Sequence, residues 1–263
     1  IRSQGDVKFS SYLGSSLHIL SGGSVDIGSV TIVAKDTVGD TINPISTPDL
    51  AYIKRTDGTP LIADGIPLII DGSKQPTLDI RAGMDATAID IPPGTSGYNP
   101  SAFESFFDDS FSRVLPPDNN PNVTGSDINI SSATVGSNGL IFLRGGNVNV
   151  KGFLATDRLI IDSINDITIN GIINTSGNIT FFADENINIL NFVTTSSETG
   201  NAGNITFFAD KNISIKGILN SVSTSSETGN AGNITFFAGD KISLGDSVSV
   251  TSNANGQGDS GKI

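Results

Sequence analysis

The segment GNITFFA occurs three times in this chain, and its repetition constrains the possible folds more than any other sequence feature. The copies begin at Gly177, Gly203 and Gly232, and the final residues Gly261-Lys262-Ile263 repeat the G-x-I start. Successive starts are 26, 29 and 29 residues apart, a period typical of solenoid proteins. We therefore expect a stack of equivalent coils, and the last G-x-I indicates a piece cut from a longer protein.

Each copy also alternates apolar and polar residues. In the first copy Ile179, Phe181 and Ala183 are separated by single residues, and the pattern resumes after a short turn. This is the period of a strand with one buried face. Polar segments at 194–202 and 224–231 indicate loops. We predict an all-β fold, a right-handed parallel β-helix, its hand following the general rule for parallel crossovers.

Stacked coils place like side chains on one another. We expect an asparagine ladder and a phenylalanine ladder, formed by Asn178, Asn204 and Asn233 and by Phe181, Phe207 and Phe236. Two earlier coils are expected to start at Gly139 and Arg158, and the starts at 139, 158 and 177 are each 19 residues apart. Similar strands are expected at 23–34 and 76–83. The sequence thus predicts one β-helix domain over residues 1–263, with about eight or nine coils.

Prolines interrupt the first half of this solenoid. All 11 lie between Pro44 and Pro121, and proline cannot donate a hydrogen bond to a sheet ladder. We therefore expect two insertions that leave the coil, over residues 35–75 and 85–122.

The two insertions carry different patterns. In the first, Asp57-Gly58 lies between two short apolar runs, as in a β-hairpin. In the second, four phenylalanines have the spacing of one face of a short helix: Phe103, Phe106, Phe107 and Phe111. We interpret that helix as a cover on the coil surface, with a protein-binding role as the alternative.

Composition excludes several classes of function. The net charge is -12 and the 15 basic residues are scattered, which argues against nucleic acid as a partner. The chain has no cysteine, so we expect no disulfide, thiolate metal site or cysteine nucleophile. No run of 18 apolar residues occurs, so no membrane span is expected.

The acidic residues predict no catalytic pair. The carboxylates nearest each other in sequence are Asp108 and Asp109, with Glu104 close by, and we interpret them as a solvated helix face. Asp184 aligns with Asp210 but is replaced by a glycine in the third copy, which favours a role in a turn.

Three further features are open to more than one interpretation. The single histidine, His18, lies between Leu17 and Ile19 and is interpreted as a structural or solvent-facing strand residue. Glu198 and Glu227 align in the loops, where solvation is favoured over a shared calcium site. One stacked threonine column would suit an ice-binding face, which we rank last: Thr180, Thr206 and Thr235. We expect no catalytic residue, cofactor or metal.

The coils GNITFFA, preceded by SLHILSGGSVDIGSVTI and PTLDIRAG, resemble the filamentous haemagglutinin type of exoprotein, particularly its large cyanobacterial members. The resemblance implies a β-helix secreted through a dedicated outer-membrane two-partner transporter, which acts at the bacterial cell surface in adhesion or aggregation. Members of that family carry an N-P-N-L or N-P-N-G motif in their secretion domain. Here only NPNV, at 120–123, approaches it, so the chain corresponds to a shaft downstream of that domain.

We therefore expect a non-catalytic, extracellular shaft segment of an adhesin, with a glycan or another cell-surface molecule as a possible partner. The alternative is a carbohydrate-active β-helix, either a polysaccharide lyase, a glycoside hydrolase or a glycan-binding module. That alternative requires a groove of carboxylates and aromatic rings. Only three tyrosines could contribute to such a groove: Tyr12, Tyr52 and Tyr98.

Overall fold

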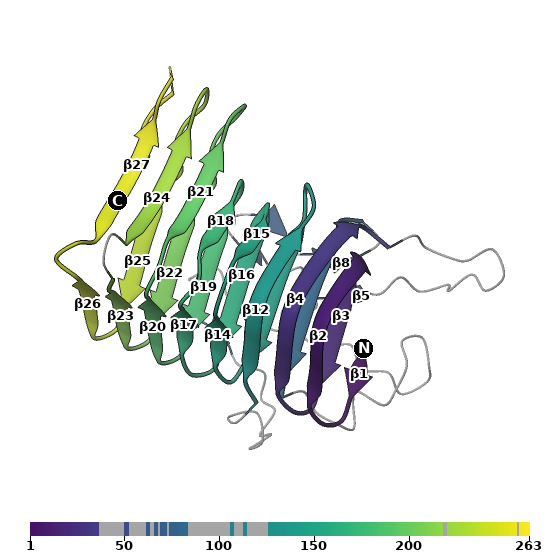
Figure 1. Cartoon of the computed structure of the whole chain (residues 1–263). Coiled ribbons are helices and arrows are strands. Elements are labelled where there is room, and N and C mark those ends of the chain that lie inside the picture. The colour runs from purple at the N-terminus through teal and green to yellow at the C-terminus, as the bar shows by residue number, and fades with distance from the viewer. Residues whose placement is uncertain are drawn as a thin grey trace.

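The computed structural model is a stack of β-coils around one long core (Figure 1). The structure describes residues 1–36, 50–52, 62–63, 66–67, 69–72, 74–83, 106–107, 113–114, 126–217, 220–256 and 258–263. Within these ranges all regular structure is β-strand. Two long sheets, here called sheet A and sheet B, hold most of the strands, and every pairing inside them is parallel. The predicted parallel β-helix is therefore confirmed.

Sheet A contains one strand from each coil. Its eight strands, in spatial order, are β1 (Arg2–Ser3), β3 (Leu17–Ser21), β9 (Thr77–Ala82), β13 (Leu140–Gly145), β16 (Arg158–Ser163), β19 (Ile179–Ala183), β22 (Ile205–Ala209) and β25 (Ile234–Ala238). The described residues thus form eight coils, which agrees with the number expected from the repeat.

Sheet B has 13 strands and divides into two arms. It begins with three long strands, β2 (Val7–Ser15), β4 (Val25–Ala34) and β12 (Ile128–Val135). The first half of β12 pairs with β14 and its second half with β15, so the sheet splits there. The first arm continues through β14 (Val148–Val150), β17 (Ile167–Ile169), β20 (Asn186–Ile189), β23 (Asn212–Ile215) and β26 (Lys241–Leu244). The second arm continues through β15 (Leu154–Thr156), β18 (Ile173–Thr175), β21 (Val193–Ser197), β24 (Ser221–Ser226) and β27 (Ser249–Ala254).

Columns of aliphatic and aromatic side chains fill the interior because every second strand residue points inward. The phenylalanine ladder lies in this core as predicted. The rings of Phe181 and Phe207 stack with centroids 5.0 Å apart, and those of Phe207 and Phe236 with centroids 4.9 Å apart. Such columns bury apolar area that a single coil could not bury alone, which makes each coil depend on its neighbours.

The asparagine ladder is also confirmed. The main-chain N–H of Asn204 donates to Oδ1 of Asn178 at 2.8 Å, and that of Asn233 donates to Oδ1 of Asn204 at 2.7 Å. Lys262 continues the ladder with its N–H on Asn233 at 2.8 Å. The glycines beside these asparagines permit the close stacking, because a Cβ on Gly203 would lie 2.2 Å from the carbonyl oxygen of the glycine below.

A second polar ladder runs along the corner between sheet A and the first arm. A side-chain oxygen in one coil accepts a hydrogen bond from the main-chain N–H, or in one step the side-chain amide, of the next coil. The ladder comprises Asp6, Ser24, Asp127, Asn147, Asp166, Asn186 and Asn212. Short side chains with an acceptor oxygen suit this corner because they reach the neighbouring backbone directly. The ladder explains part of the richness in aspartate and asparagine.

The outer face of sheet A is buried as well, contrary to the single buried face that we expected. All six residues of β9 are buried, as are five of the six in β13 and in β16. A second apolar cluster lies on this face and consists of Ile70, Leu140, Phe142, Ile160 and Phe182, with Phe208 packed against it. Ile70 belongs to β8 (Ile69–Asp71), which lies in the first insertion.

This burial overturns the ice-binding interpretation of the threonine column. Thr180 is 2% exposed and Thr206 is 7% exposed, so neither hydroxyl can contribute to a flat solvent-facing array. The three threonines do stack in register, as predicted.

The first insertion separates the second coil from the third, since β4 ends at Ala34 and β9 begins at Thr77. It contains two antiparallel pairs, β5 (Leu50–Tyr52) with β8 and β6 (Ile62–Ala63) with β7 (Ile66–Pro67). We expected antiparallel pairing in this insertion, but between different strands. Tyr52 pairs with Ile69 in place of the apolar run after Asp57-Gly58, and Asp57-Gly58 itself lies outside the described residues.

The second insertion interrupts the third coil at the corner between β9 and β12. Its described residues form β10 (Phe106–Phe107) and β11 (Arg113–Val114), which pair antiparallel. The predicted helix is therefore wrong at Phe106 and Phe107. Phe103 and Phe111 lie outside the described residues.

Candidate binding site

A buried ionic cluster lies on the outer face of sheet A. His18 on β3 is in register with Asp79 on β9, and its Nδ1 lies 3.1 Å from Oδ2 of Asp79. Nε of Arg81 donates to Oδ1 of the same carboxylate at 2.9 Å. The side chains of Asp79 and Arg81 are fully buried, and that of His18 is 12% exposed. Of the two interpretations of His18, the structural one fits this position.

The partners of Asp79 keep it ionised despite burial. Burial by itself raises the pKa of Asp79, but the charge of Arg81 and the hydrogen bond from His18 outweigh it and lower the pKa below its usual value. The guanidinium of Arg81 also lies 5.3 Å from the ring centre of Phe142, within the range of a cation–π contact. The side chains of this cluster are almost completely buried, so it offers no open binding surface.

Of the acidic residues that the sequence raised as possible catalytic carboxylates, Asp184 and Asp210 lie within the described residues. Glu104, Asp108 and Asp109 lie outside the described residues. The main-chain N–H of Asp210 donates to the carbonyl of Ala183, the residue before Asp184, so the two aspartates occupy equivalent turn positions in successive coils.

Glu198 and Glu227 also occupy equivalent positions, in the loops after β21 and β24. Oε1 of Glu227 accepts a hydrogen bond from the side-chain amide of Asn255 at 3.0 Å. In the described part of the chain, no group of three or more His, Cys, Asp and Glu side chains is arranged to hold a metal ion.

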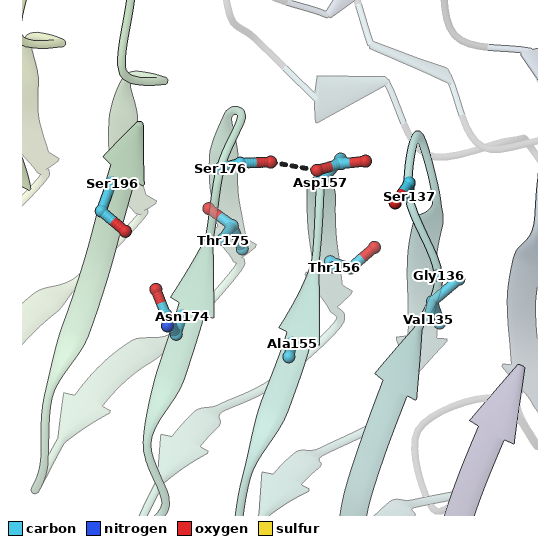
Figure 2. A pocket seen from close by; sticks show the side chains of 10 residues that line it. All are labelled: Val135, Gly136, Ser137, Ala155, Thr156, Asp157, Asn174, Thr175, Ser176 and Ser196. Carbon is cyan, nitrogen blue, oxygen red and sulfur yellow. Dashed lines mark hydrogen bonds between the residues drawn. The ribbon is translucent and has the colours of Figure 1, made fainter. Parts of the chain in front are cut away.

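The candidate binding site is a hollow of about 400 Å³ at the corner between the second arm and sheet A (Figure 2). Four successive coils line it, through the turn after β12, the ends of β15 and β18, and β21. Its lining residues are Val135, Gly136, Ser137, Ala155, Thr156, Asp157, Asn174, Thr175, Ser176 and Ser196. The lining thus includes hydroxyl groups, one amide, one carboxylate and a few small apolar side chains.

Unequal coil lengths create this hollow. The coils that begin at Gly139 and Arg158 are 19 residues long, and the coil that begins at Gly177 has 26. The extra residues lengthen β21 and its loop, so that β21, β24 and β27 project beyond β15 and β18 (Figure 1). The hollow lies at this step, with the short coils as its floor and Ser196 of β21 at its wall.

Asp157 is held in place by two donors. The main-chain N–H of Asn138 and the hydroxyl of Ser176 both donate to its carboxylate, one to each oxygen. Figure 2 shows the bond between Ser176 and Asp157 across the rim of the hollow. The carboxylate therefore ties three coils together at the rim.

Thr156 differs from its equivalents in later coils. The hydroxyls of Thr175, Thr195 and Thr224 each donate to the carbonyl of a corner glycine at 2.7 Å. Only Asp157 separates β15 from β16, so the coil of Thr156 has no such glycine after it. The Oγ1 of Thr156 is buried without a hydrogen-bond partner, and Thr156 as a whole is 7% exposed. In β15 the buried residues Leu154 and Thr156 alternate with the half-buried Ala155, so this hydroxyl lies on the inner side of the strand.

The sequence predicted neither the buried cluster of His18, Asp79 and Arg81 nor the hollow. Aligning SLHIL with TLDIR would have placed His18 over Asp79, two residues before a buried arginine. For the hollow, the available signal was the change of coil length from 19 to 26 residues at Gly177.

No protein family, curated protein or solved structure matches this chain. A search of the described residues for a helix long and apolar enough to cross a membrane found none.

Proposed function

We propose that the chain is a stiff shaft segment of a secreted bacterial exoprotein of the filamentous haemagglutinin type. In this role it stands at the cell surface, takes part in attachment or aggregation, and catalyses no reaction. Its route to the surface is a two-partner outer-membrane transporter that exports the full-length protein.

The unbroken register of sheet A through eight coils is the observation that carries this proposal. Main-chain hydrogen bonds of such a sheet run along the axis of the stack, and bending the stack requires many of them to stretch together. The corner ladders add side-chain hydrogen bonds in the same direction. This arrangement supports a spacer that holds other modules at a fixed distance.

The hollow supports binding better than cleavage. Hydrolysis of a glycoside requires two carboxyl groups that face one substrate. The residues that line the hollow include one carboxylate, Asp157, and both of its oxygens already accept hydrogen bonds. We therefore favour a glycan-contacting adhesin segment over a lyase or a hydrolase.

Surface labelling tests this proposal directly. Fab fragments raised against the folded chain should label intact producing cells and should reduce their attachment or aggregation. The same Fab fragments absorbed beforehand with the purified chain serve as the control. Label that appears only after the cells are permeabilised would overturn the proposal.

The export route has its own test. The parent reading frame should encode a secretion domain upstream of this segment, with a gene for a barrel transporter nearby, and deletion of that gene should abolish the surface label. Surface label that persists after the deletion would overturn the two-partner route and leave the shaft role intact.

A further inference from the structure

We propose that an apolar patch at the corner between the two arms of sheet B is a contact surface for a second copy of this chain. The corner is the bend that joins β14 to β15, β17 to β18 and β20 to β21 (Figure 1). The patch, here called the corner patch, consists of Phe153, Ile172, Leu190 and Phe192. This inference rests on the proposed role in aggregation and deepens it, because it names the partner and the place of contact.

One column of the corner changes from polar to apolar in three consecutive coils. The main-chain N–H of Leu154 donates to the carbonyl of Ile172 at 2.9 Å. The N–H of Ile173 donates to the carbonyl of Phe192 at 2.9 Å in the same way. Phe153, Ile172 and Phe192 therefore stack on one another. The register of the remaining coils gives the full column as Ser11, Ser29, Ser132, Phe153, Ile172, Phe192, Ser221 and Ser249.

The fold does not require apolar residues at this position. Serine occupies it in the other five of the eight coils, so a small polar side chain is compatible with the stacking. Phe153 and Ile172 are nevertheless 42% and 40% exposed, and Leu190, in the adjoining column, is 44% exposed. Leaving apolar area in water forgoes about 25 cal/mol per Å². A contiguous apolar patch on a solvated face is typical of an interaction surface.

The charges around the corner patch favour a second copy as its partner. The outward side chains of the flanking strands are neutral, namely Asn149, Thr168 and Asn188 on the first arm and Ala155, Asn174 and Thr194 on the second. The column of Leu190 carries two exposed lysines, Lys151 and Lys216.

This surface contrasts with the chain as a whole, whose net charge of -12 makes two copies repel one another. A face without carboxylates is where two copies approach at the least electrostatic cost. An anionic membrane is a poorer match, because two lysines do not offset the net charge and recognition of anionic lipid usually takes a cluster of about four to eight basic residues.

The order of residues in the patch suits a two-fold pair. Identical surfaces that meet about a two-fold axis make each contact twice. An axis through Ile172 places Phe153 of one copy against Phe192 of the partner subunit, and leaves Lys151 and Lys216 at the rim, where their stems extend into water. Four side chains are few beside the roughly 800 Å² per partner of a standard interface, so a single contact is weak. Many shafts held side by side at one surface combine such contacts.

Sedimentation velocity on the purified chain gives the first test. We expect the weight-average sedimentation coefficient to rise between about 10 μM and about 500 μM, with a dissociation constant on the order of 0.1 mM. The association should strengthen in about 0.5 M salt, because salt screens the repulsion between two acidic copies and leaves the apolar contact intact. A monomer at every concentration, or an association that weakens with salt, would overturn the proposal.

Matched variants locate the contact. Ile172→Ser introduces the residue that five other coils carry at this position and should weaken the association at least about tenfold. Val33→Ser replaces another exposed apolar residue of sheet B, 63% exposed on β4, and should leave the association unchanged. Circular dichroism establishes that both variants are folded. Equal association of wild type and Ile172→Ser, or equal loss in both variants, would contradict the assignment.

Asn170→Asp and Asn253→Asp form a second pair that leaves the core untouched. Each adds one negative charge at an exposed residue, but only Asn170 lies in the column of Leu190. The first should weaken the association about fivefold or more, and the second should have no effect. If both or neither weaken it, the corner patch is not the contact.

Cross-linking tests the two-fold axis. The chain has no cysteine, so the thiol of Ile172→Cys forms a protein disulfide only with the same residue of a second copy. Residues on a two-fold axis come close enough for that bond, so oxidised glutathione should give a covalent dimer at least about fivefold faster than with Val33→Cys. Equal rates for the two variants would contradict a contact centred on Ile172.

Vesicles of phosphatidylglycerol and phosphatidylcholine test the membrane as the other partner. The wild type should stay in solution when such vesicles are sedimented. Vesicle binding that Ile172→Ser abolishes, in a chain that does not self-associate, would assign the corner patch to a lipid surface and overturn the proposal. Surface labelling of cells does not depend on any of these results, so failure of self-association and failure of the shaft proposal can be told apart.

Discussion

The outer faces of sheets A and B differ in how much of their surface is buried. On sheet B, strands such as β14 and β17 alternate buried and half-buried residues, as a sheet with one wet face should. On sheet A, strands β9, β13 and β16 are buried almost throughout. Two-sided burial removes the alternation and places residues such as Phe142 and Arg81 on a face that would otherwise meet solvent.

Burial also changes what an ion pair contributes. Lys8 and Asp26 pair at 3.0 Å on sheet B with side chains 78% and 49% exposed. Asp79 and Arg81 pair at 2.9 Å on sheet A with side chains fully buried. The exposed pair is screened by water and is worth little. The buried pair must stay complete, because either charge alone in the interior is costly.

The largest loss of stability is expected from a substitution in the apolar cluster on the outer face of sheet A. Phe142→Ala removes a fully buried ring and its contact with Arg81, so it should lower the free energy of unfolding by about 4 kcal/mol. Phe237→Ala, on the same face of the last coil where the ring is 45% exposed, should cost about 1 kcal/mol. Urea denaturation measures both, and equal losses would show that sheet A is not covered.

Breaking the buried ion pair should cost nearly as much. Asp79→Asn leaves the guanidinium of Arg81 buried beside a neutral amide and should destabilise the fold by about 3 kcal/mol. Asp26→Asn on sheet B provides the matched control and should change stability by less than about 0.5 kcal/mol. The same denaturation experiment compares them, and a small effect at Asp79 would mean that water reaches the pair.

Acid should lower the stability of the wild type more than that of Asp79→Asn. The pKa of Asp79 is lowered in the folded state, so its stabilising contribution is fully present above the ordinary aspartate pKa of about 4 and is lost as the pH falls through the lowered value. Thermal midpoints followed by circular dichroism from pH 6 to pH 2.5 should therefore fall more steeply for the wild type than for Asp79→Asn. Parallel curves would contradict the assignment.

A smaller effect is expected in the asparagine ladder. Asn204→Ala removes the acceptor for the N–H of Asn233 and should cost about 1 kcal/mol. Asn188→Ala, at an outward position of β20, should cost less than about 0.5 kcal/mol. Thermal denaturation distinguishes them, and a loss at Asn188 as large as that at Asn204 would count against the ladder.

The smallest effect is expected from the exposed pair itself. Lys8→Ala should change the free energy of unfolding by less than about 0.5 kcal/mol, and by still less in 1 M salt. A salt-insensitive loss above 1 kcal/mol would show that sheet B is not as open as its exposed fractions indicate.

The sequence predicted what depends on repetition. The coil period and the asparagine and phenylalanine ladders follow from identical residues that recur every 26 to 29 positions, because stacking makes those residues neighbours. The stacking of Asn178, Asn204 and Asn233 could be predicted from the repeats alone.

What the sequence did not predict depends on segments that do not repeat. Phe142 and Phe182 are buried on the outside of sheet A, and no period relates them to Ile70, which lies in an insertion. The pairing of Tyr52 with Ile69 likewise depends on a fold of the insertion that simple turn signals did not indicate. The hollow depends on a difference between coils, which an alignment of their similarities conceals.

The asparagine ladder also gives the stack a polarity. Each side-chain oxygen faces the following coil and accepts that coil's N–H, as Asn178 does from Asn204. If a polypeptide emerges from a narrow opening with its amino terminus first, each new coil meets acceptor oxygens on the coil that folded before it.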